Sequence, residues 1–302
     1  MTPMHADVPA EPPTDGEAVA PRFQVHAYPL ALRIVSSVLL VLSTALVLHA
    51  SERILFATFT GAMNPKPPAL AGWLALLALV LFGLTRLIRW LTAATFSVEP
   101  SRFVLQRRGD RFEIPVTSVE SVRVWRLPLP GAGLSLRMQS GRGFQYALQV
   151  ADPLPVLEAI GRDGSQTSAA VRHPLTVFAH ARAMIVRRRW YRLALKFVLF
   201  PLLPAAAMFY THQSITYGGP FGQYQWYGLG PYLRTFSTYW IFSTAVLVLF
   251  ASLWRVLSEL VAFVAVWISP PYARGVRRFV EVACAVLYYV GFPALLAWQY
   301  LQ

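Results

Sequence analysis

One long polar segment, residues 95–162, decides the fold, and it begins TFSVEPSRFVLQRRGDRFEIPVTSVESVRV. Apolar and polar residues alternate along much of it, as in RFEI (111–114). This period of two is typical of a strand with one buried face. Turn residues separate the alternating runs at 100–101, 109–110 and 140–143. The segment therefore predicts several short antiparallel strands.

A short amphipathic helix is expected to follow the strands. Asp152 is placed to cap it, and Pro153 suits its first turn. Leu154, Leu157 and Ile160 recur at helical spacing and give the helix one apolar face. The sheet is thus expected to be closed by one helix.

Two phrases in this segment, FVLQRRG (103–109) and IPVTSVESV (114–122), follow directly on two apolar runs. Together they resemble the bacterial pleckstrin-homology-like domains of membrane-flanked proteins. The resemblance is limited to residues 95–162. It implies a non-enzymatic β domain that binds a partner or a second copy of itself, and no lipid site is carried over from it. A small sheet domain of another fold is the alternative.

The rest of the chain is apolar. Hydrophobic residues make up 56% of the sequence and charged residues 14%, a balance typical of proteins with several membrane spans. One crossing needs about 20 apolar residues. We therefore predict an α-helical integral membrane protein with an inserted small antiparallel β domain and five transmembrane helices, at residues 29–50, 69–91, 193–210, 235–254 and 279–300.

The fourth apolar run is longer than one straight crossing requires. It continues from Arg234 to Ile268 and is interrupted only by Arg255 and Glu259. Either one tilted helix uses the whole run, or the crossing ends near residue 254 and residues 255–268 lie at the membrane interface. The sequence leaves both open.

The charged segments give the expected organisation and orientation. Only Arg53, Lys66 and Arg234 of the 27 Lys and Arg residues fall on one side of the predicted spans, so the positive-inside rule places the N-terminus and β domain in the cytoplasm and the C-terminus in the periplasm. Arginine greatly exceeds lysine, which suggests a high-GC bacterial genome and a bacterial inner membrane.

The predicted units are a disordered acidic tail (1–28), two spans (29–91), the β domain (95–162), a linker with a basic juxtamembrane helix (163–192), and three spans (193–302) that include an outer Gly/aromatic loop (212–234).

Three charged residues form a candidate intramembrane polar cluster. Arg255 and Glu259 are four residues apart and share a helix face, and Glu281 lies early in the fifth span. A charge at mid-bilayer costs about 2.5–3.5 kcal/mol on insertion scales and marks a functional site by default. The cluster could serve a proton or substrate path. The favoured alternative is an ion pair that holds the fourth and fifth helices together.

Arginines gather near the end of the basic helix and form a candidate contact for anionic lipid. Each basic residue near an anionic membrane surface contributes about 1 kcal/mol of attraction. The alternative is that these residues only fix the topology. They are Arg182, Arg187, Arg188, Arg189 and Arg192.

Aromatic residues dominate the predicted outer loop. They could form a docking surface for a partner or a platform for sugar or lipid, because ring faces stack on apolar surfaces. The alternative is an interfacial aromatic belt. The residues are Tyr217, Phe221, Tyr224, Trp226, Tyr227 and Tyr232.

No catalytic motif, metal motif or cofactor motif stands out, and the single Cys284 excludes a disulfide within one chain. The net charge of +13 is explained by topology, so no nucleic-acid partner is expected. The expected function is a non-enzymatic scaffold, assembly or regulatory protein that contacts membrane lipids and a membrane or cytoplasmic protein, or a second copy of itself. The alternatives are a small transporter or membrane enzyme and an anionic-lipid-sensing regulator.

Overall fold

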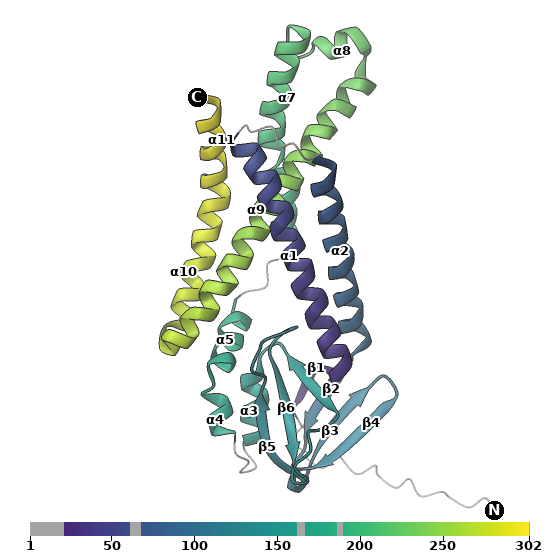
Figure 1. The fold of residues 1–302 in the computed structure, drawn as a ribbon, viewed down its shortest axis with the longest axis vertical. Coiled ribbons are helices and arrows are strands. Elements are labelled where there is room, and N and C mark those ends of the chain that lie inside the picture. The colour runs from purple at the N-terminus through teal and green to yellow at the C-terminus, as the bar shows by residue number, and fades with distance from the viewer. Residues whose placement is uncertain (1–20, 61–67, 162–166, 186–189, 302) are drawn as a thin grey trace, which may run out of the picture.

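The structure is a computed structural model that describes residues 21–60, 68–161, 167–185 and 190–301. Long helices stand together on a sheet domain at one end of the molecule (Figure 1). The chain begins the sheet, leaves it for two helices, returns to complete the sheet, and then forms the remaining helices. The sheet and the helices are therefore interleaved in sequence.

One antiparallel sheet of seven strands has the order β4-β3-β2-β1-β7-β6-β5. The predicted turns lie at or beside strand ends, and the prediction of short antiparallel strands is confirmed. The strands are β1 (Arg22–Pro29), β2 (Ala93–Val98), β3 (Arg102–Arg107), β4 (Asp110–Pro115), β5 (Val119–Val124), β6 (Gly133–Met138) and β7 (Tyr146–Val150).

The central strand, β1, comes from a part of the chain that was not expected in the sheet. It pairs with β2 on one side and with β7 on the other. The predicted disordered tail is therefore wrong for residues 22–28, while residues 1–20 lie outside the described part. Alternation was present in FQVHAY (23–28), where Val25 and Ala27 are buried, but this short run is separated from the other strands by two long helices.

The first two helices are an insertion into the sheet. α1 (Leu30–Thr60) follows β1 directly, and α2 (Pro68–Leu91) ends just before β2. The Ala27 backbone N–H donates to the Thr92 carbonyl at 2.8 Å. This bond holds the chain that enters α1 beside the chain that leaves α2. The β domain is therefore larger than residues 95–162, and two neighbouring strands tie it to the helix pair.

The core of the sheet domain lies between the sheet and α3 (Pro153–Gly161). The helix presents Val156, Leu157 and Ile160 to buried strand residues such as Phe96 and Leu148. The Asp152 side chain accepts a hydrogen bond from the Leu154 amide at 3.1 Å. The predicted closing helix and its cap are both confirmed.

Five helices are long and apolar enough to span a membrane, in agreement with the predicted number. They occupy Leu30–Leu55, Gly72–Leu91, Trp190–Tyr217, Leu229–Ile268 and Pro270–Leu295. The third consists of α6 (Trp190–Ala194), the π-helical η2 (Leu195–Leu199) and α7 (Leu202–Tyr217). The fifth begins with the short η3 (Pro270–Tyr272). It continues through α10 (Ala273–Val286), the π-helical η4 (Leu287–Gly291) and α11 (Phe292–Leu301).

The fourth helix, α9 (Leu229–Ile268), is continuous over 40 residues. At 1.5 Å per residue it is about 60 Å long. Residues 255–268 therefore continue the helix and do not form a separate segment. Ser269 and η3 then turn the chain into α10.

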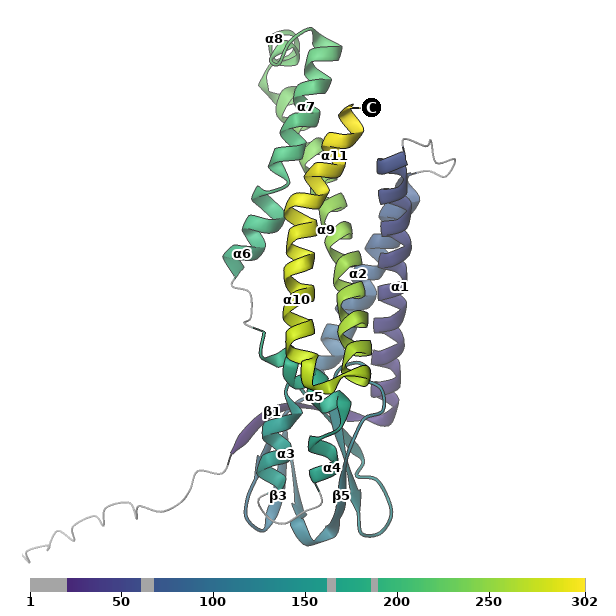
Figure 2. The ribbon, with the colours of Figure 1, turned by 90° about the vertical axis from the view of Figure 1, so that its left-hand side faces the viewer.

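The region predicted as the Gly/aromatic loop 212–234 is mostly helical, so that prediction is wrong. α7 reaches Tyr217, and a short α8 (Gly222–Tyr227) precedes α9. The chain turns at Gly218 and Gly228, whose φ angles of 74° and 81° suit glycine. In both views, α8 and the adjoining ends of α7 and α9 extend beyond the other helices (Figures 1 and 2). We call α8 with residues 213–221 and 228–235 the tip.

The single basic helix expected within residues 163–192 is also corrected. The described residues hold α4 (Ser168–Val171) and α5 (Pro174–Ala183), and α6 begins at Trp190. His173 accepts a hydrogen bond from the Leu175 amide through Nδ1 at 3.2 Å and so caps α5, which then ends before residue 184. Residues 163–166 and 186–189 lie outside the described part.

Candidate functional site

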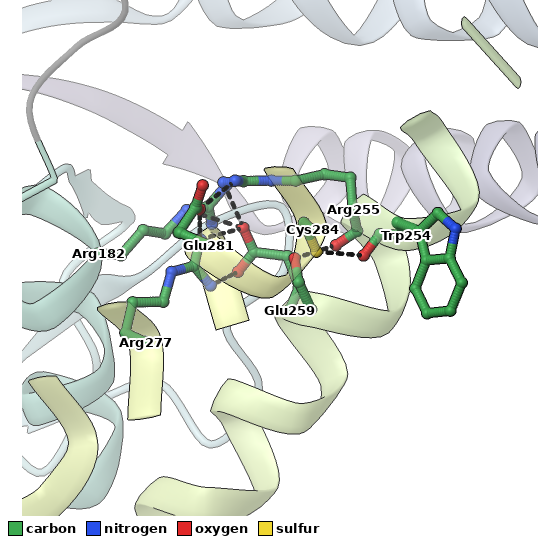
Figure 3. Close-up of polar contacts among 8 residues, drawn as sticks. Arg182, Trp254, Arg255, Glu259, Arg277, Glu281 and Cys284 are labelled. Atoms are coloured by element: carbon green, nitrogen blue, oxygen red, sulfur yellow. Dashed lines mark hydrogen bonds and ion pairs between the residues drawn. The ribbon is translucent and has the colours of Figure 1, made fainter. Parts of the chain in front are cut away.

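The predicted residues Arg255, Glu259 and Glu281 do come together, at the end of the helices that adjoins the sheet domain (Figure 3). Arg255 Nη2 donates to Glu259 Oε1 at 2.8 Å, and Arg255 Nη1 donates to Glu281 Oε1 at 2.5 Å. These contacts join α9 to α10. The interpretation as a link between the fourth and fifth helices agrees with this geometry.

A fourth residue, Arg277 of α10, lies at the centre of the cluster and was missed from the sequence. Its Nη1 and Nη2 atoms donate to the two oxygens of Glu259, each at 2.8 Å, and Nη2 lies 3.3 Å from Glu281 Oε1. Such bidentate pairing is strong and directional. Arg277 is only 2% exposed. Its spacing of four from Glu281 was the signal that could have found it.

Arg182 connects this cluster to α5. Its Nε atom lies 3.7 Å from Glu259 Oε1. Glu259 is therefore surrounded by three arginines from three helices: Arg182, Arg255 and Arg277. We call these residues with Glu281 the ion cluster. Its carboxylates are occupied by protein donors, which is the arrangement of a clamp between helices.

Apolar contacts reinforce the clamp. Phe178 and Ala181 of α5 pack with Ala262 and Val266 of α9 and with Ala273 of α10. These small and aromatic side chains are all buried. The charged and apolar contacts together fix α5 against the last two long helices.

On its other side α5 is bound to the sheet domain. His180 Nδ1 lies 3.0 Å from Asp152 Oδ2, the same side chain that caps α3. α5 therefore bridges the sheet domain and the helices. It does so with a polar contact on each side: His180 to α3, and Arg182 to α9.

Two cation–π contacts join the sheet domain to the first two helices. The Arg33 guanidinium of α1 lies 3.7 Å from the ring centre of Trp125, just after β5. The Arg108 guanidinium, between β3 and β4, lies 4.1 Å from the ring centre of Trp90 in α2. Such contacts add about 0.5–2 kcal/mol depending on desolvation. The domain is thus fixed to the helices from several directions.

His26 of β1 is a titratable group at the junction of the sheet domain and α2. It is half-buried, and its Nε2 lies 3.5 Å from Arg89 Nη2 of α2. Burial, and then the positive charge of Arg89, lower the pKa of His26. The neutral imidazole is therefore favoured in the folded protein.

The predicted basic cluster is divided. Arg182 belongs to the ion cluster, and Arg192 lies in α6. Arg187, Arg188 and Arg189 lie outside the described residues. Lipid contact by the five arginines as one group remains a prediction.

The aromatic residues of the tip fall into two sets. Tyr232 packs against Phe209 and stacks on Phe221, and Tyr217 contacts His212. The exposed set comprises Tyr224, Trp226 and Tyr227, with Trp226 72% exposed, and Phe221 is exposed as well although it stacks on Tyr232.

A buried amide network holds the tip together. Gln213 Nε2 donates to Gln223 Oε1 at 2.7 Å, and the backbone N–H of Gln223 donates back to Gln213 Oε1 at 3.2 Å. Gln223 Nε2 also donates to Thr235 Oγ1 at 3.0 Å. Gln213 is fully buried. The network joins α7, α8 and α9 without any charged group. Isolated glutamines carry no motif, so no sequence pattern points to these residues.

Comparison with protein-family models, curated proteins and solved structures finds no match.

Proposed function

We propose that the protein is a non-enzymatic scaffold or regulatory protein of a bacterial inner membrane, in which α9 couples an outer tip to a cytoplasmic β domain. The observation that carries this proposal is the continuity of α9. It contributes Thr235 to the amide network near one end and Arg255 and Glu259 to the ion cluster nearer the other.

The length of α9 supports the coupling. The helix is about 60 Å long, whereas a bilayer with its headgroup regions is about 40–45 Å thick. A helix of this length reaches beyond the bilayer even when moderately tilted. The bias of Lys and Arg toward the sheet-domain side supports a cytoplasmic β domain and a periplasmic C-terminus.

The β domain has surfaces suited to a protein partner or a second copy. Among the described strands, β4 pairs only with β3 and β5 only with β6. An edge strand can accept an added strand from a partner. The resemblance to pleckstrin-homology-like domains supports the same role, and the exposed aromatic residues of the tip offer a second contact.

The clamp favours this role over a transporter or membrane enzyme. A transport path through Glu259 and Glu281 would need carboxylates free to exchange partners. In the structure Arg277 binds Glu259 through two donors and is itself buried. Separating such a buried pair would leave an uncompensated charge, and this is costly. The pair therefore suits a permanent structural link.

The test is a pull-down of the tagged full-length protein in a gentle detergent, with mass spectrometry of the retained proteins. We expect a stoichiometric partner, or a defined oligomer of this chain. Replacing Trp226 and Tyr227 by Ala should release a partner bound at the tip, while Trp73→Ala, which removes an exposed tryptophan from α2, should retain it. A monomer without partners would overturn the scaffold proposal.

A further inference from the structure

A large cavity of about 2320 Å³ opens between the first two helices and the later ones, next to the sheet domain. Pockets for drug-sized ligands measure about 300–1,000 Å³, so this cavity suits a larger molecule. Its walls come from α1, α2, η2, α9, α10 and η4, and its floor comes from the sheet and α5.

The cavity is apolar along the long helices. Leu40 and Val47 of α1, Phe82 of α2, Val248 of α9 and Tyr289 of η4 line it there. Because these helices are long and apolar enough to span a membrane, this part of the cavity suits hydrocarbon chains.

The cavity is strongly basic where it approaches the sheet domain. Its lining there includes Arg86, Arg89, Arg108 and Arg182. Glu281 is the acidic residue among the described lining, and it already pairs with Arg255 and Arg277. This end of the cavity therefore carries a large excess of positive charge.

Several of these cations lack a carboxylate in the structure. Within the described residues, no Asp or Glu forms an ion pair with Arg86, Arg89 or Arg108. Arg86 and Arg182 also lie close enough to Arg89 to repel its positive charge. An anion bound among Arg86, Arg89 and Arg182 would relieve this repulsion.

We propose that the cavity binds an anionic phospholipid. The phosphate group would lie among Arg86, Arg89, Arg108 and Arg182, and the acyl chains would lie between the first two helices and α9–α10. Charge complementarity selects an anion, and the apolar wall selects one that carries hydrocarbon chains. This inference does not depend on the scaffold role, because it concerns a ligand and not a protein partner.

The test is native mass spectrometry of the full-length protein in neutral detergent, with phosphatidylglycerol and phosphatidylcholine added in equal amounts. We expect phosphatidylglycerol to be retained preferentially. Each basic residue near an anionic headgroup contributes a factor of about five in affinity. The variant R86Q/R89Q should therefore weaken phosphatidylglycerol binding by about 30-fold.

A matched control separates the cavity from overall charge. R126Q/R142Q removes two exposed arginines of the sheet domain that do not line the cavity, and it should leave binding unchanged. Arg108→Gln, a change at an exposed hairpin residue, should lower affinity by about fivefold and provides the test if R86Q/R89Q fails to fold. Equal retention of both lipids, or equal losses in cavity and control variants, would overturn the proposal.

A second pair of variants distinguishes a lipid from a soluble phosphate. Ala75→Trp places a large ring in the apolar wall of α2, whereas Leu76→Trp enlarges the next residue, which is exposed and does not line the cavity. We expect only Ala75→Trp to reduce phosphatidylglycerol binding, and we expect inorganic phosphate to compete poorly. Effective competition by inorganic phosphate together with normal binding to Ala75→Trp would show a soluble-anion site and contradict the lipid proposal.

Discussion

The two ends of α9 are fixed by different chemistry. Near the sheet domain, three arginines and two glutamates form the ion cluster. At the tip, two glutamines and a threonine form a neutral network. A buried charge needs a partner far more than a buried amide does, because its desolvation cost is larger. The ion-cluster end should therefore be the more sensitive to single substitutions.

The largest effect is expected from Arg277→Ala. Removing this buried cation leaves Glu259 and Glu281 with incomplete pairing, and breaking such a pair costs about 3–5 kcal/mol. Thermal unfolding of the purified protein in detergent should show a large decrease in Tm. Arg274→Ala removes an exposed arginine from the same helix and should have little effect. Equal Tm values for the two variants would contradict the clamp.

A smaller loss is expected from Glu259→Gln. The amide keeps the size of the side chain and one accepting oxygen for the arginines, so the net loss should be about that of one charge-assisted hydrogen bond, about 1.5–3 kcal/mol. We expect faster hydrogen exchange in α5, because Arg182 loses its ionic partner on α9. If function were lost while α5 stayed protected and assembly stayed intact, a transporter or enzyme would be the better interpretation.

At the tip, Gln213→Ala should cost about 1–3 kcal/mol, because it leaves the side-chain oxygen and the backbone N–H of the buried Gln223 without their partner. The effect should be local, with increased hydrogen exchange in α8 and unchanged exchange in α5. Gln225→Ala, at an exposed position of α8, is the control. Increased exchange in α5 would mean that the tip and the clamp are one cooperative unit.

The smallest effect is expected from pH at the junction of β1 and α2. The pKa of His26 is lowered in the folded protein by burial and by Arg89, so the unfolded chain binds a proton more readily. Stability should therefore fall as the pH drops below about 6.5, the ordinary histidine pKa. His26→Gln should reduce this dependence of stability on pH. A residual dependence should remain, because burial also lowers the pKa of His173. An unchanged slope in the variant would be the contrary result.

The sequence predicted local features well and long-range ones less well. The number of long apolar helices, the strands after residue 95 and the cap at Asp152 follow from periodicity and turn chemistry within short windows. The place of β1 does not, because its pairing partners begin more than 60 residues later, after the α1–α2 insertion. Contacts of that kind are not encoded in any local pattern.

The candidate site shows the same division. The spacing of Arg255 and Glu259 placed them on one face, and Glu281 was correctly grouped with them. Arg277 and Arg182 were not, since both also fit the general excess of arginine near predicted membrane boundaries. The tip was expected as a loop because glycine and proline favour turns, but Gln213 and Gln223 stabilise short helices between those turns.

A distance across α9 tests whether one helix links the tip to the clamp. Spin labels can replace Leu233 and Val264, two exposed residues near opposite ends of the helix, in a chain that carries Cys284→Ser. In lipid nanodiscs, electron paramagnetic resonance should give one narrow distance of about 47 Å between the labelled backbone positions, the length of 31 helical residues. A clearly shorter or broad distribution would show that the helix bends or breaks near Arg255, and would contradict coupling through a continuous α9.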